Sequence, residues 1–374
     1  MTSSFATGLT FGLQMAANSE DGMMKAQNTN RFRGVCAAAW AAALMSACPL
    51  HAQGAGVEHT DATGETSEIA PIGVRPPAFM KIPPSARGPE IDRKKGYRIE
   101  SLGTGLYMIT DNAYQSMFMV YDHGVVVIDA PPSYAGKVRE AVGEVTGKPI
   151  THLIYSHSHA DHIGGAGSLG PVPVIIAHGE TKRLLVRDAD PQRPIPTITF
   201  DDRYTLRLGS QVLELSYPGN GHEPGNIMIY APAQEVLMFV DIVFPGWMPF
   251  RRFGVAQDIP GYFEQVRELD RLPFKKLVGG HVSRIGTHED VKLQIEFDDD
   301  IKAAVLAALH SQVFGTELDG AEPANSWAFV SDYTARVAGQ CVTTMTPKWK
   351  NKLAGFDTFI WDQCYAMEQS LRVD

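Results

Sequence analysis

Four side chains able to bind a metal ion fall within six consecutive residues, His157-Ser158-His159-Ala160-Asp161-His162. Imidazole nitrogens and carboxylate oxygens are the ligands that zinc prefers where thiolates are absent. Because side chains alternate along an extended backbone, His157 and His159 can point to the same side. Asp161 and His162 can then turn toward a neighbouring position, since Gly164-Gly165 permits a turn into a helix. The segment therefore predicts two adjacent metal positions.

Three further candidate ligands follow apolar stretches or lie among glycines. His222 lies within the glycine-rich segment 219–225, Asp241 ends the apolar run 236–240, and His281 follows the run 276–280. A single His or Asp at a strand end is usually structural. Because they follow the first cluster in this order, the three residues are stronger candidate ligands together than each one is alone.

Together these residues resemble the metallo-β-lactamase superfamily, whose pattern is HxHxDH followed by a distant His, Asp and His. The resemblance covers roughly residues 97–289. It implies an α/β fold, a four-layer αβ/βα sandwich with metals at one edge between two sheets. It also implies a first metal bound by His157, His159 and His222, a second bound by Asp161, His162 and His281, and Asp241 bridging both. Asp129 resembles the family's supporting aspartate, outside the ligand set.

The activity implied by the resemblance is hydrolysis with two zinc ions per chain. Two metals about 3.5–4 Å apart can clamp a shared water and lower its pKa to about 7, so that a bridging hydroxide attacks the substrate. Asp161 is the expected catalytic residue, which orients this hydroxide or moves a proton. His159 occupies the position where diiron members carry a carboxylate, which favours zinc over iron.

The substrate class is inferred from Asp241. A bridging aspartate resembles glyoxalase II and lactonase-like members, which favours a small ester, lactone or related amide, whereas zinc β-lactamases place Cys or Ser near that site. The chain departs from the family pattern at Glu223 and at Phe239-Val240. The alternatives are a β-lactamase-like activity, a phosphodiesterase, a mononuclear-iron oxygenase of the same fold, and a metal-binding protein without turnover.

An aromatic and basic segment, residues 244–253, follows Asp241 closely. One interpretation makes it a substrate-binding wall, with Trp247 and Phe250 against an apolar substrate and Arg251 or Arg252 against an anion. The alternative is a loop packed on the C-terminal part of the chain or on a partner copy.

Composition limits the partners. The 374 residues carry a net charge of −9 without a long basic cluster, which argues against nucleic-acid binding and for a small-molecule substrate. Arg31 and Arg33 precede an apolar run over 34–47, too short to span a bilayer and typical of a secretory signal. A periplasmic or secreted protein without a transmembrane helix in its mature form is expected, with Cys48 as a lipid anchor in an alternative reading.

The expected organisation has four parts. They are a signal region over 1–52, an extended arm over 53–95, a catalytic domain over 96–290 and a helical extension over 291–374. Thr287 and Asp290 predict a capped helix start at the last boundary. Cys341 and Cys364 could pair in an oxidising compartment or remain free thiols. The extension could form a homodimer interface or close over the pocket.

Overall fold

The computed structural model describes residues 69, 71, 78–315 and 317–374. The expected signal region, with Cys48, and most of the expected arm lie outside the described residues. Within the described part of the chain, no helix is both long and apolar enough to cross a membrane.

The first sheet has seven strands in chain order, from β1 to β7. Their bounds are β1 Arg98–Gly103, β2 Leu106–Thr110, β3 Gln115–Tyr121, β4 Gly124–Ile128, β5 Ile150–Ile154, β6 Val174–His178 and β7 Ile198–Phe200. Strands β1 to β4 pair antiparallel, and β4 to β7 pair parallel. The parallel strands need crossovers, which include the helices α1 Val138–Val145, α2 Ala160–Ile163 and α3 Gly179–Asp188.

The second sheet has five strands in the order β12-β11-β10-β9-β8. Their bounds are β8 Arg203–Leu208, β9 Gln211–Ser216, β10 Met228–Ala231, β11 Val236–Met238 and β12 Lys276–Val278. The helices α4 Arg251–Val255 and α5 Ile259–Leu269 lie between β11 and β12 in the sequence. β12 returns parallel to β11, so the loops that follow these two strands leave the same edge of the sheet.

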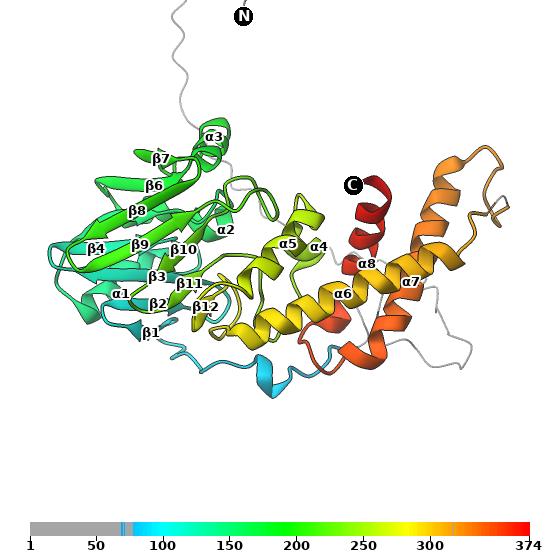
Figure 1. Ribbon diagram of the computed structural model, residues 1–374, viewed down its shortest axis with the longest axis horizontal. Coiled ribbons are helices and arrows are strands. Elements are labelled where there is room, and N and C mark those ends of the chain that lie inside the picture. The colour runs from blue at the N-terminus through cyan, green and yellow to red at the C-terminus, as the bar shows by residue number, and fades with distance from the viewer. Residues whose placement is uncertain (1–68, 70, 72–77, 316) are drawn as a thin grey trace, which may run out of the picture. The chain divides into compact units, whose positions relative to one another are not determined.

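The two sheets pack face to face, and helices cover their outer faces. Met117 and Met119 of β3 belong to the core that joins the sheets, together with Leu215 and Ile229 of the second sheet. Phe118 points the other way, into a core that includes residues of α1. This alternation is the period of two that a strand imposes. The expected four-layer arrangement is confirmed (Figure 1).

Three helices form the C-terminal extension: α6 His288–Ser311, α7 Ser326–Trp349 and α8 Phe356–Val373. The Thr287–Asp290 capping box is present at the start of α6, as expected. α6 packs against α5, and its apolar residues share one core with that helix and with α7 and α8 (Figure 1). A disulfide joins Cys341 of α7 to Cys364 of α8, which confirms the pairing that the sequence left open.

Candidate metal centre

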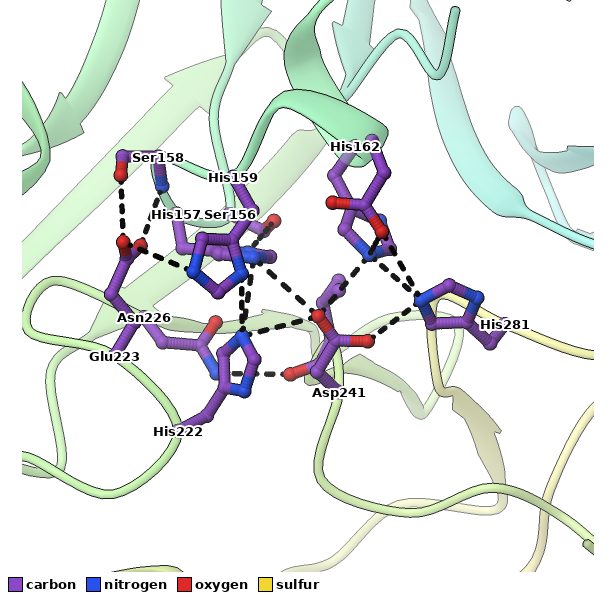
Figure 2. A network of polar contacts seen from close by, with 12 residues as sticks. Ser156, His157, Ser158, His159, His162, His222, Glu223, Asn226, Asp241 and His281 are labelled. Carbon is purple, nitrogen blue, oxygen red and sulfur yellow. Dashed lines mark hydrogen bonds and ion pairs between the residues drawn. The ribbon is translucent and has the colours of Figure 1, made fainter. Parts of the chain in front are cut away.

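All seven predicted ligands lie in segments that follow strands at one edge of the two sheets. His157 and His159 follow β5, and Asp161 and His162 lie in α2. The other three follow β9, β11 and β12, in that order: His222, Asp241 and His281. Figure 2 shows the side chains of four histidines around the carboxylate of Asp241: His157, His162, His222 and His281.

The first donor set consists of His157, His159, His222 and Asp241. Nε2 of His222 lies 3.0 Å from Nδ1 of His159 and 3.4 Å from Nε2 of His157. Oδ2 of Asp241 lies 3.2 Å from Nε2 of His222 and 3.5 Å from Nε2 of His157. In a tetrahedral zinc site with bonds of about 2.0–2.1 Å, donor atoms are about 3.3 Å apart. The spacing of this set therefore fits zinc.

The second set consists of Asp161, His162 and His281. Nε2 of His162 lies 3.0 Å from Nε2 of His281 and 3.5 Å from Oδ2 of Asp161. Asp241 also reaches this set, because its Oδ1 lies 2.9 Å from Nε2 of His281 and its Oδ2 lies 3.2 Å from Nε2 of His162. Despite this short distance, the contact with His281 does not have the geometry of a hydrogen bond, so the buried Oδ1 of Asp241 has no hydrogen-bond donor within the described residues, as expected of a metal ligand.

The electrostatics of the centre favour the binding of cations. Burial lowers the pKa of His157 well below its usual value, and the neighbouring histidines lower it further, so this side chain offers a lone pair. Burial alone would also lower the pKa of His162, but the charge of Asp241 raises it to about 9. Burial opposes ionisation of Asp241, yet His162, His281 and His222 hold its pKa well below the usual range. A metal ion would supply the positive charge that a proton on His162 provides here.

Hydrogen bonds outside the ligand set position the ligands. The buried carboxylate of Asp129 accepts a hydrogen bond of 2.8 Å from the backbone N–H of Ser156, and burial raises the pKa of this carboxyl to about 6. Oγ of Ser156 lies 2.9 Å from Nδ1 of His157, which leaves Nε2 for the metal. The side-chain amide of Asn226 donates to the carbonyl of Val240, next to Asp241 (Figure 2). Asp129 thus lies beside the ligand set, where the sequence placed it.

Glu223 contacts the predicted ligand His159, whereas in the sequence it stands out only as a departure from the family pattern. Its Oε1 lies 3.3 Å from Nε2 of His159. It also accepts hydrogen bonds from the backbone N–H and the hydroxyl of Ser158, at 3.0 and 2.8 Å. A carboxylate directly after the ligand His222 was the available signal. Its contacts fix the orientation of His159.

A cavity of about 260 Å³ opens over both donor sets. It is lined by Ala113, Tyr114, His159, Asp161, Asp241, Phe250, Gly254, Val255 and His281. Phe250, expected to contact substrate, is one of these residues, whereas Trp247 and Arg251 are not. The indole N–H of Trp247 donates to the carbonyl of Ala86. Arg251 lies near Asp362 of α8, where its charge opposes the pKa rise that burial causes in that carboxyl.

Residues 109–281 match the family model described as the metallo-beta-lactamase superfamily. This matched segment holds all seven predicted ligands, and the match agrees with the two sheets and with the order of those residues. The chain is 28% identical over 215 residues to the 2,4-dinitroanisole O-demethylase subunit alpha of Nocardioides sp. (strain JS1661), covering 56% of this chain and 64% of that relative. It is 29% identical over 155 residues to the metallo-beta-lactamase type 2 of Elizabethkingia meningoseptica, covering 38% of this chain and 60% of that relative.

The chain thus spans less than two thirds of the length of either relative. Among solved structures, it is similar to the metallo-beta-lactamase from Pontibacter korlensis, with 18% identity and a TM-score of 0.48. That alignment covers 54% of this chain and 99% of the other.

Proposed function

We propose that this chain is a dinuclear zinc-dependent hydrolase that acts on a small ester, lactone or related amide. The observation that carries the proposal is the position of Asp241. Its Oδ2 lies 3.2 Å from His222 of the first donor set, and its Oδ1 lies 2.9 Å from His281 of the second. A carboxylate between two donor sets suits a bridging ligand, and Oδ2 alone also lies 3.2 Å from Nε2 of His162 in the second set.

Two zinc ions held in these sets would supply Lewis-acid polarisation of the substrate and a water whose pKa is lowered to about 7. The residues of the chain supply the rest. Asp161 lines the cavity with a side chain that is 44% exposed, so its carboxylate can take a proton from water and pass it to the leaving group. Burial, together with the charges of Asp161 and Asp241, raises the pKa of Tyr114. Tyr114 therefore stays neutral and available as a hydrogen-bond donor in the cavity.

A second candidate is cleavage of an aryl methyl ether. The chain aligns over 56% of its length with a protein named as a 2,4-dinitroanisole O-demethylase subunit. The apolar side chains that line the cavity, Phe250 and Val255 among them, suit a neutral aromatic ring. Both candidate substrates are uncharged, and a test on the purified protein separates them.

The experiment is a substrate panel on zinc-loaded protein, with and without chelator. The panel contains an acyl-homoserine lactone, p-nitrophenyl acetate, a thioester, a chromogenic β-lactam, an aryl phosphodiester and 2,4-dinitroanisole. We expect turnover of the ester or lactone that chelator abolishes, with two zinc ions per chain by metal analysis. Turnover confined to the ether, the β-lactam or the phosphodiester would replace the proposal by that activity. One iron per chain would favour the oxygenase alternative.

We also propose that the chain is exported to the periplasm or beyond and that its partner is a small molecule. The Cys341–Cys364 disulfide supports export, because disulfides persist in oxidising compartments. Cell fractionation with detection of the tagged C-terminus tests this, and a wholly cytoplasmic protein would contradict it.

A further inference from the structure

One wall of the cavity consists of residues 249–255, which we call the lip. Phe250, Gly254 and Val255 of the lip line the cavity together with Asp161 and Asp241. Both Phe250 and Val255 remain exposed although they are large and apolar. The lip therefore presents apolar surface toward the space in which a substrate would meet the metal ligands.

The backbone of the lip is strained. The φ angles of Arg252, Phe253, Gly254 and Val255 are 50°, 55°, 71° and 59°, so four consecutive residues are left-handed. L side chains rarely adopt this conformation, and β-branched residues such as Val255 are the least suited to it. Such a turn persists only where its surroundings hold it, and strain of this kind concentrates at binding sites.

The group that holds the lip is the side chain of Gln363, on α8 of the extension. Its Oε1 accepts a hydrogen bond of 2.7 Å from the backbone N–H of Phe253. Its Nε2 donates to the carbonyls of Pro249 and Phe250, at 2.7 and 3.0 Å. Gln363 is fully buried, so no water can replace these bonds if the side chain is removed. One amide side chain thus satisfies three backbone groups of the lip.

The helix that carries Gln363 is itself fixed in place. The next residue, Cys364, is joined by its disulfide to Cys341 of α7. Phe359 of α8 packs edge-on against Phe250, with ring centroids 5.3 Å apart. α4, which forms most of the lip, also contacts α8 (Figure 1). The extension therefore acts on the cavity through the lip, although it contributes no side chain to the cavity lining.

The chemistry of the cavity wall indicates what it would accept. Its lining residues are apolar or belong to the metal ligands, apart from Tyr114, and no Lys or Arg of the described chain is among them. A substrate carboxylate or phosphate bound at this wall, away from the metals, would have no positively charged side chain beside it. The free energy lost on removing it from water would then not be offset by an ion pair. An uncharged apolar chain would instead bury surface against Phe250 and Val255.

We propose that Gln363 is a positioning residue that holds the lip over the metal centre, so that the site selects neutral substrates with an apolar chain. The inferred substrate class rests on the proposed hydrolase function, whereas the positioning of the lip by Gln363 does not. The two parts therefore need separate measurements.

The first measurement is amide hydrogen exchange across residues 249–256 in the zinc-loaded protein. Gln363→Met keeps the volume of the side chain and removes its hydrogen bonds. We expect exchange at Phe253 to rise by about tenfold or more, with the zinc content unchanged. Val337→Ala, which loosens the core of the extension without touching the lip, serves as the control. Equal exchange in the wild type and Gln363→Met would overturn the proposal, even if the protein hydrolysed no ester.

The second measurement compares esters of different chain length and charge. For Gln363→Met, we expect KM for p-nitrophenyl hexanoate to rise about tenfold, because several methylene groups lose their contact surface. KM for p-nitrophenyl acetate should change less than about twofold, since its acyl group is too short to use the lip. The wild type should prefer the hexanoate to the mono-p-nitrophenyl ester of adipic acid, which has the same length and a terminal carboxylate. Preference for the charged ester, or an equal KM change for both neutral esters, would overturn the substrate class. Absence of all ester turnover would instead contradict the proposed function.

Discussion

The carboxylate of Glu223 lies 3.3 Å from Nε2 of His159, while Nδ1 of the same ring lies 3.0 Å from Nε2 of His222. The two nitrogens of His159 therefore have different tasks. Nδ1 faces the first donor set, and Nε2 can carry the proton that is shared with Glu223 (Figure 2). A carboxylate behind a ligand histidine fixes its tautomer and increases its basicity.

Replacing Glu223 by Gln is expected to weaken zinc binding at the first donor set by about 10- to 100-fold. The glutamine amide lacks the negative charge that makes His159 a stronger metal ligand. Its NH₂ group would also point at a hydrogen-bond donor of Ser158 or His159, with which it cannot form a hydrogen bond. The measurement is zinc affinity by competition with a chromogenic chelator. Glu180→Gln, at a surface ion pair with Arg183, is the matched control and should bind zinc as the wild type does. Equal affinities for the two variants would show that Glu223 has no part in metal binding.

The candidate ligand set, which the structure brings together, could be predicted from the sequence because its signals are local. Four of the seven ligands fall between His157 and His162, and the others directly follow apolar runs that form β11 and β12 or lie among glycines. The grouping into two sets agrees with the geometry because the family order fixes which loops meet at the sheet edge. The runs that form β11 and β12 were visible as apolar stretches, whereas the partly exposed edge strand β1 and the polar helix α3 have no such signal.

What the sequence could not supply depends on contacts between distant segments. Gln363 reaches the lip across more than a hundred residues, and no local pattern distinguishes it from other glutamines. Trp247 was expected near the substrate because it is aromatic and close to Asp241 in sequence. Its indole N–H instead donates to the carbonyl of Ala86, which is 161 residues away in the sequence, so no local pattern could indicate this partner.

Asp161→Ala and His162→Ala should each lower turnover by more than about 100-fold. Substitution of residues that only hydrogen-bond to metal ligands already lowers metal affinity or activity by up to about 100-fold. Each variant should still fold, because the two-sheet core does not depend on these side chains. Steady-state kinetics on the substrate identified by the panel, with circular dichroism for folding, makes the comparison. His123→Ala, at the exposed turn between β3 and β4, is the control and should keep full activity. Near-normal turnover in either ligand variant would refute the proposed mechanism.

Removing the disulfide should destabilise the extension. The bridge closes a segment with a sequence separation of 23, and a loop of this size constrains the unfolded chain by about 3 kcal/mol. The double variant Cys341→Ala/Cys364→Ala should therefore unfold at lower urea concentration than the wild type. Thiol titration of the denatured wild type should yield two more thiols after reduction than before. No increase on reduction would mean that the bridge is absent in the protein.

Asp298 should make the protein less stable as the pH rises. The side chain is fully buried in α6, where it accepts one hydrogen bond of 2.8 Å from Gln294, and its other oxygen has no hydrogen-bond partner within the described residues. Burial raises its pKa well above the usual value, so the folded state favours the protonated acid. Stability from this group is fully present below the unfolded pKa of about 3.9 and is lost as the pH rises toward the folded pKa.

Asp298→Asn removes this dependence, so the difference in unfolding free energy between variant and wild type should grow from pH 5 to pH 8. At pH 8 the variant should be more stable by more than about 0.5 kcal/mol, beyond the usual effect of a surface change. Urea unfolding at several pH values measures it, with Asp299→Asn at the exposed neighbouring position as the control. A difference that stays constant with pH would show that Asp298 is ionised in the folded protein.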